Sequence, residues 1–246
     1  MHDQIDKQKS TEEVTNKKGS KRLVWDLPLR LFHWLLVLSI AASWATAKAG
    51  VEWTEIHFLL GYWTAGLLVF RLIWGFVGPK HARFASFIPS VKSVFLYLRG
   101  FLKGHGKQAV GHNPMGALMV FAILAIVGAQ VVTGLFASDD ILFSGPFNSL
   151  VDGKLSETIT RLHNFNFDVI LFLIFAHISA VLIYLFKKKQ NLILPMITGR
   201  KSKDVVPDDE AIKSSRLFIA LCVVAVSVLI VWGVLSLAPP PVDDFY

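Results

Sequence analysis

Apolar positions dominate five long stretches of the chain, and charged residues collect in the segments between them. The stretches cover residues 27–47, 55–77, 113–137, 157–186 and 214–238. A bilayer core about 30 Å thick needs roughly 20 apolar residues in helical conformation. Helices satisfy their own backbone hydrogen bonds, so lipid-crossing segments of this length are helical. The pattern predicts an all-α integral membrane helical bundle with five spanning helices.

A shorter pattern lies between the second and third stretches. In residues 89–103, apolar side chains recur at helical spacing while Lys92, Arg99 and Lys103 occupy another side of the circumference. This arrangement predicts an interfacial helix on the membrane surface. We expect an anchor that organises the loop, with a partner-docking role as the alternative.

The order of these segments predicts three regions. Residues 1–22 are polar and mixed in charge, without an apolar signal segment, so we expect a disordered cytoplasmic tail. Residues 23–201 hold four spanning helices and the interfacial helix. Residues 202–246 hold a linker, the fifth spanning helix and a short tail after it.

Lys and Arg residues predict the orientation, because they favour the cytoplasmic side of a membrane. Residues 1–30 carry seven, residues 78–112 carry six and residues 187–216 carry eight, whereas the alternate loops are poor in them. We therefore expect a multi-pass protein of the bacterial inner membrane with a cytoplasmic N-terminus and a periplasmic C-terminus. This topology accounts for the net charge of +7 without a nucleic-acid partner.

Four histidines inside the apolar stretches sort into two pairs by depth. His33 and His177 fall toward the cytoplasmic side, and we call them the inner pair; His57 and His163 fall toward the periplasmic side, and we call them the outer pair. His163 and His177 lie fourteen positions apart on one helix. At ~100° and ~1.5 Å per residue, their side chains lie within about 40° of each other around the helix and ~21 Å apart along it. Both rings can therefore face one interior seam.

Two neutral imidazoles from facing helices form the ligand set of a low-spin haem iron. The two pairs predict two haem b groups, one near each membrane face, held in a four-helix di-haem core. The alternative for each histidine is a hydrogen bond to a neighbouring helix. Cys222 is the sole cysteine, which excludes a CxxCH attachment, so any haem is bound without thioether links.

Other polar residues suggest supporting roles. Arg71 and Arg30 are candidates to pair with a haem propionate, and Arg30 could instead reach lipid headgroups. His81 and His112, at the cytoplasmic interface, are candidates for a quinone or proton site, because imidazole titrates near neutrality. The alternative is a helix-capping, water-binding interface. Four glycines could let a flat macrocycle approach the backbone: Gly61, Gly66, Gly128 and Gly134.

Several motifs resemble the prokaryotic cytochrome b561 family, which is similar to the b-type cytochrome subunit of nickel-iron hydrogenases. They are VWDLPLRLFHW at 24–34, HFLLGYWTAGLLVFRLIWGFVGPKHARF at 57–84, GHNPMG at 111–116, the two histidines of the fourth spanning helix and NLILPMITGRK at 191–201. The resemblance implies two b haems on the four paired histidines and electron exchange with membrane quinone. The fifth spanning helix goes beyond the family pattern.

These observations predict a protein that transfers electrons between the quinone pool and a periplasmic partner such as a cytochrome c or a hydrogenase. A quinone oxidoreductase activity is compatible with this role. A histidine-lined metal or proton transporter is one alternative, although its ligands would converge at one depth. A membrane anchor subunit of a redox complex is another. The sequence also leaves open a homodimer.

Overall fold

The computed structural model describes residues 21–103, 109–139 and 143–240. Within them, five helices are long and apolar enough to cross a membrane. They are α2 (Leu27–Ala49), α3 (Thr54–Val77), α5 (Pro114–Phe136), α6 (Gly153–Phe186) and α8 (Leu217–Leu235). The predicted membrane bundle is confirmed, and the helices lie close to the predicted ranges.

Capping side chains determine where three of these helices begin. Asp26, Asn113 and Asp152 each precede a helix and accept a hydrogen bond from a backbone N–H of its first turn, at Leu29, Gly116 and Leu155 respectively. Asp152 explains why α6 begins at Gly153 rather than at the predicted residue 157. The first turn of α6 is polar, so hydropathy alone does not detect it.

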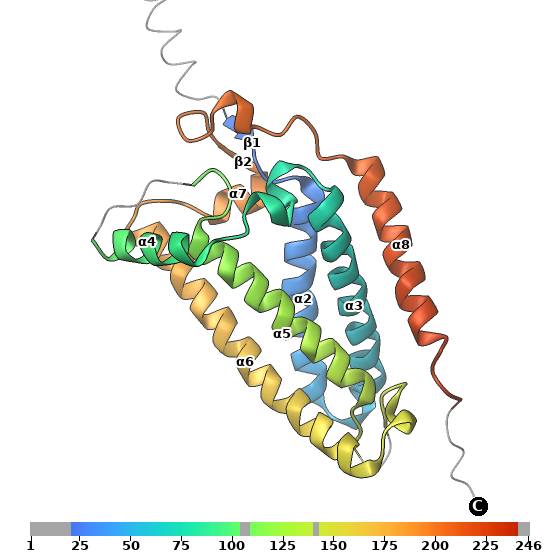
Figure 1. Cartoon of the computed structure of the whole chain (residues 1–246). Helices are drawn as coiled ribbons and strands as arrows, with labels where there is room; N and C mark the ends of the chain where they lie inside the picture. The colour runs from blue at the N-terminus through green and yellow to red at the C-terminus, as the bar shows by residue number, and fades with distance from the viewer. Residues whose placement is uncertain (1–20, 104–108, 140–142, 241–246) are drawn as a thin grey trace, which may run out of the picture.

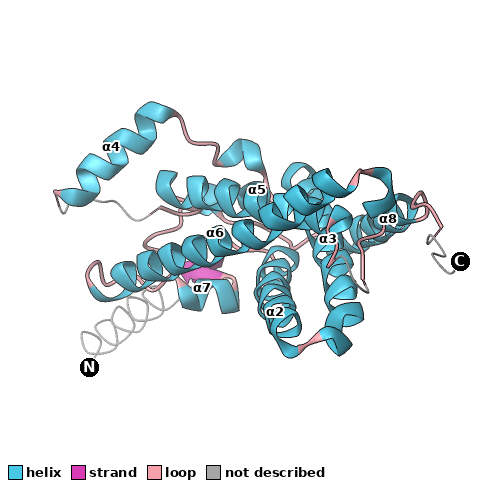
Figure 2. Ribbon diagram, turned by 90° about the horizontal axis from the view of Figure 1, so that it is seen from below, coloured by secondary structure: helices cyan, strands magenta, loops and turns pink. Residues whose placement is uncertain are grey.

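The spanning helices form two hairpins (Figures 1 and 2). α2 packs closely along α3, and α5 packs closely along α6, while α3 also contacts α5. α2 and α6 make few direct contacts with each other. The two hairpins are therefore joined mainly through α3 and α5.

The ends of the bundle differ. The N-terminal end, where α2 begins, is covered by a two-stranded antiparallel ribbon of β1 (Lys21–Leu23) and β2 (Arg200–Ser202), preceded by α7 (Ile193–Thr198). The predicted tail is therefore wrong at Lys21 and Arg22, which pair with a strand far away in the sequence; its residues 1–20 lie outside the described residues. The other end, which we call the far end, holds the loop between α5 and α6.

Two helices lie at opposite edges of the bundle. α8 packs on α3 through its small side chains Ala220, Val223 and Ser227. α4 (Val91–Leu102) extends from the N-terminal end beside α5. Short 3₁₀ helices occupy Val51–Trp53, Lys80–Ala82, Phe84–Ser86, Asn148–Leu150 and Asp208–Glu210.

Candidate functional site

The four intramembrane histidines meet as two pairs. The ring centroids of His33 on α2 and His177 on α6 are 6.4 Å apart, and those of His57 on α3 and His163 on α6 are also 6.4 Å apart. The pairs are the ones that depth matched in the sequence. Their role as haem ligands stays a prediction.

The spacing of each pair fits a metal ion between the two rings. Metal–imidazole bonds of about 2 Å place the two nitrogens about 4 Å apart, and the ring centroids roughly 6 Å apart once half of each ring is added. The rings are not parallel: the angles between their planes are 54° in the inner pair and 82° in the outer pair. Coordination by haem iron does not require parallel imidazoles, so both pairs fit the group.

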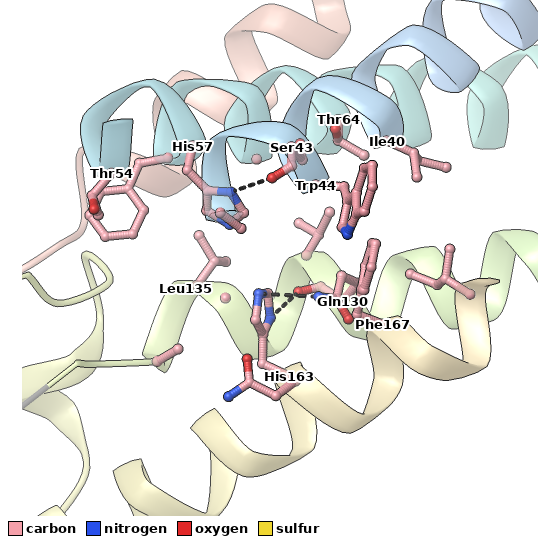
Figure 3. Close-up of a pocket in the computed structure, with 18 of the residues that line it drawn as sticks. Ile40, Ser43, Trp44, Thr54, His57, Thr64, Gln130, Leu135, His163 and Phe167 are labelled. Carbon is pink, nitrogen blue, oxygen red and sulfur yellow. Dashed lines mark hydrogen bonds between the residues drawn. The ribbon is translucent and has the colours of Figure 1, made fainter. Parts of the chain in front are cut away.

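The outer pair borders a cavity of about 830 Å³ lined by α2, α3, α5 and α6 (Figure 3). Nδ1 of His57 lies 2.9 Å from the carbonyl oxygen of Ser43, to which it donates. A carbonyl partner fixes the tautomer and leaves Nε2 as the free ligand atom. Gly61 also lines this cavity, and an added Cβ there would meet nothing within 4 Å. The predicted room for a flat group is present at this glycine.

His163 is held by a polar cluster on α5. Its Nδ1 lies 3.1 Å from the carbonyl oxygen of Gln130 and 3.0 Å from Oγ1 of Thr133. The Gln130 side-chain amide lies 3.1 Å from Nε2 of His163, and Asn166 donates to the oxygen of that amide. A metal ion at Nε2 would take the place of the Gln130 amide, and this glutamine would then have to turn aside.

Unpartnered buried polar atoms gather toward the N-terminal end of the bundle, where His33 also lies. In the described part of the chain, five buried side-chain nitrogen or oxygen atoms have no hydrogen-bond partner, namely His33 Nδ1, Asp26 Oδ2, Arg30 Nε, Arg71 Nη2 and His112 Nδ1. Asp26, Arg30 and His33 are spaced four and three residues apart, so they share one face of α2. Buried polar groups normally have partners. The free donors of the two arginines fit the carboxylates of a haem.

The two arginines also make protein contacts. Arg71 is 1 % exposed; it donates to the carbonyl oxygen of Ala82 at 3.2 Å, and its guanidinium lies 4.4 Å from the Phe84 ring centroid. Arg30 donates to the carbonyl oxygen of Ile197 at the end of α7. This protein contact differs from the predicted lipid alternative for Arg30. Each arginine retains one buried nitrogen that can donate to a further acceptor.

His81 and His112 line a second cavity, of about 380 Å³, at the N-terminal end. Nε2 of His81 donates to the carbonyl oxygen of Glu210 at 2.8 Å, in the linker before α8. The ring of His112 lies between those of Trp25 and Phe87, with centroids 4.8 and 4.5 Å away. The structure therefore places both predicted residues in one polar site.

Burial changes the chemistry expected of His112. Burial, and then the positive charges of Arg71 and Lys201, hold the pKa of His112 well below its ordinary value of 6.5. The neutral-pH titration assumed from the sequence therefore does not apply to this ring. The capping alternative applies to its neighbour Asn113, whose side chain caps α5.

The sequence reading missed the residues that hold the histidines. The outer pair is contacted by Ser43, Gln130 and Thr133, while Asn166 binds the Gln130 side chain and Glu210 contacts His81. Gln130 could have been found, because an amide within an apolar spanning helix requires a partner. The Ser43 contact uses a backbone carbonyl, for which a side-chain pattern gives no signal.

The sequence of this chain is similar to those of known proteins. The model of the prokaryotic cytochrome b561 family matches residues 24–199, which excludes α8. A probable Ni/Fe-hydrogenase B-type cytochrome subunit of Azotobacter chroococcum is 26 % identical, over 78 % of this chain and 93 % of the relative. The corresponding Ni/Fe-hydrogenase 1 subunit of Escherichia coli K12 is 24 % identical, over 73 % of this chain and 90 % of the relative.

The matches agree on a b-type cytochrome, a membrane protein that binds haem b and transfers electrons. The matched region includes all four paired histidines and ends before the linker to α8. The chain belongs to the prokaryotic cytochrome b561 family.

Proposed function

We propose that this protein carries two haem b groups and transfers electrons between membrane quinone and a hydrogenase-type complex. The observation that carries the proposal is the meeting of four histidines in two pairs, each with ring centroids 6.4 Å apart. Because His163 and His177 lie on one continuous helix, the two pairs are ~21 Å apart along it. This spacing supports one haem toward each membrane face.

Each pair would hold its haem by the two Nε2 atoms. Haem supplies reversible one-electron redox chemistry, and the protein sets its position and potential. At the outer site, Ser43 and Gln130 orient the rings through Nδ1. At the inner site, Arg30 and Arg71 offer donors to propionates.

The partner is proposed from the relatives, which are cytochrome subunits of Ni/Fe-hydrogenases. The distribution of Lys and Arg favours the N-terminal end on the cytoplasmic side of the inner membrane, so the outer pair lies toward the periplasm. A periplasmic hydrogenase would then exchange electrons at the outer pair. The cavity with His81 and His112, beside the inner pair's end of the bundle, is our candidate for the quinone head group.

A metal transporter is the weaker of the candidate functions. In residues 21–103, 109–139 and 143–240, three or more His, Cys, Asp or Glu side chains do not gather at any point that could hold a metal ion. Paired imidazoles at two depths suit two macrocycles, each of which supplies four nitrogen ligands of its own. The proposal therefore rests on haem rather than on a bare metal ion.

Haem content measured on the purified full chain tests the proposal. We expect a reduced-minus-oxidised spectrum of a b-type cytochrome and two haems per chain by pyridine haemochrome assay. One haem per chain would contradict the di-haem assignment, and no b-type spectrum would contradict the function. Stopped-flow reduction by menaquinol and ubiquinol analogues then tests the quinone, and failure of both would remove it from the proposal.

A further inference from the structure

Helix α4 presents an apolar stripe that is exposed in the described part of the chain. It lies across the N-terminal end of the bundle rather than along the spanning helices, at the edge away from α8 (Figures 1 and 2). Val91, Phe95 and Leu98 are 89, 65 and 42 % exposed. They are spaced four and three residues apart and share one side of the helix. Exposed apolar stripes of this kind mark an interaction surface.

A second side of α4 is cationic. Lys92, Arg99 and Lys103 are exposed, and in the described residues none of them forms an ion pair with this chain. The sequence contains no Asp or Glu between Glu55 and Asp139. These three positive charges are therefore available to an external anion.

The third side of α4 attaches to the bundle. The hydroxyl of Tyr97 hydrogen-bonds that of Tyr184 on α6, and Asn113 donates to the same Tyr184 hydroxyl at 3.1 Å. Lys188 lies 4.8 Å from the centroid of the Phe101 ring. These contacts fix the rotation of α4 about its axis, so the apolar and cationic sides face away from the bundle.

Helical geometry relates the three sides. At ~100° per residue, the cations lie about 100° around the helix from the apolar stripe, and Tyr97 and Phe101 lie about 100° around in the other direction. A helix lying in a membrane interface has this organisation, with an apolar side toward the acyl chains and basic residues at the headgroups. A second copy of the same surface would bring like charges together, which disfavours a homodimer here.

We propose that α4 is a docking site for anionic phospholipid. Val91, Phe95 and Leu98 enter the acyl region, while Lys92, Arg99 and Lys103 bind headgroup phosphates. Each basic residue near an anionic surface strengthens the attraction about fivefold, so three together give a preference of up to about 100-fold over a zwitterionic lipid. The docked helix holds Tyr97 against Tyr184.

Lipid quenching on the full chain tests this site. The exposed Cys222 is first replaced by Ala, and a bimane fluorophore is attached at Phe95→Cys. The protein is reconstituted in phosphatidylcholine vesicles containing phosphatidylglycerol, with one or the other lipid brominated. We expect brominated phosphatidylglycerol to quench the fluorophore several-fold more strongly than brominated phosphatidylcholine.

Two triple variants distinguish an effect of the α4 cations from an effect of the protein's net charge. In the variant Lys92→Gln/Arg99→Gln/Lys103→Gln, the two brominated lipids should quench the fluorophore equally. The matched control Lys21→Gln/Lys203→Gln/Lys213→Gln removes three exposed charges from the same end of the bundle and should keep the preference. The control therefore carries the same change in net charge.

Three outcomes would overturn the proposal. If neither brominated lipid quenched the fluorophore, α4 would not enter the membrane. Equal quenching in the parent protein would remove the anionic preference. Loss of the preference in inorganic phosphate, but not in chloride of equal ionic strength, would assign the cations to free phosphate instead of lipid.

Discussion

The outer and inner histidine pairs have the same spacing but different surroundings. In the outer pair, Nδ1 of both rings faces a backbone carbonyl, that of Ser43 or of Gln130. In the inner pair, Nδ1 of His33 is buried without a partner, and Arg30 lies one turn before it on α2. Arg71 is the second arginine that we propose for the inner haem, since its Nη2 is also buried without a partner. On the proposed haem assignment, the outer site is supported by hydrogen bonds to its two rings and the inner site by positive charge.

This difference predicts unequal haem potentials. A hydrogen bond from Nδ1 to a carbonyl raises the basicity of the ligand, which stabilises oxidised iron. Positive charge near the haem stabilises the reduced form, which carries one positive charge less. We expect the inner haem to have the higher potential, so electrons move downhill from the outer site to the inner site.

Removal of a histidine should have the largest effect. His33→Ala and His177→Ala should each abolish the inner haem alone, whereas His57→Ala and His163→Ala should each abolish the outer one. Haem content should fall from two to one per chain, and redox titration should identify which potential disappears. His81→Ala is the control and should retain both haems. Loss of different haems from His33→Ala and His177→Ala would break the comparison.

Neutralisation of Arg71 should lower the reduction potential of the inner haem and leave that of the outer haem unchanged. A potential shifts by the difference in interaction energy between the two redox states, so the whole of a charged hydrogen bond, about 1.5–3 kcal/mol or roughly 60–130 mV for one electron, is the upper limit. We expect Arg71→Gln to lower the inner potential by no more than this amount in a spectroelectrochemical titration. Arg71→Lys retains the charge and should recover most of the shift. An equal shift of both haems would mean that Arg71 acts through the fold instead.

The helices and the two pairs could be predicted because hydropathy and helical periodicity are local properties. The depth of a residue within a spanning helix follows from counting residues, and only residues at matching depths can meet across a bundle. The partners of the rings could not be predicted in this way. Ser43 and Gln130 lie 14 and 33 residues from the histidines they contact, and their backbone carbonyls carry no residue-specific signal.

The N-terminal end shows the same limit. Lys201 counted as a loop charge in the topology prediction, yet it is buried and donates to the carbonyl oxygens of Ala109 and Val110. Burial accordingly lowers the pKa of Lys201 to about 8. The pairing of β1 with β2 brings Lys201 there, and that pairing joins residues far apart in the sequence, such as Lys21 and Ser202. Patterns within a short window do not detect such contacts.

A methyl group at Gly134 should weaken haem binding at the outer pair, which is a smaller effect than the loss of a histidine. An added Cβ would lie 3.0 Å from Cε1 of His163, closer than ordinary contact. We expect Gly134→Ala to bind the outer haem up to about tenfold more weakly, as altered ligand support does elsewhere, and to leave the inner haem unchanged. Gly128→Ala is the matched control on the same helix, since its Cβ would meet nothing within 4 Å. Equal haem occupancy in both variants would show that His163 has room to shift.

His112, at the end of the bundle nearer the inner pair, predicts a pH dependence of stability. Burial keeps this imidazole neutral in the folded protein, whereas in the unfolded chain it takes up a proton as pH falls below 6.5. The unfolded state then binds more protons, so the free energy of unfolding should fall with decreasing pH, by up to about 1.4 kcal/mol per pH unit.

His112→Phe isolates this contribution because it keeps an aromatic ring between Trp25 and Phe87 but removes the titrating group. Burial raises the pKa of Asp26, which acts in the opposite direction, but both proteins share that group. We therefore expect the difference in unfolding free energy between His112→Phe and the parent protein to grow as pH falls below 6.5, measured by denaturant unfolding in detergent. Parallel pH profiles would mean that His112 gains a proton in the folded protein, which would restore it as a proton carrier beside the inner site.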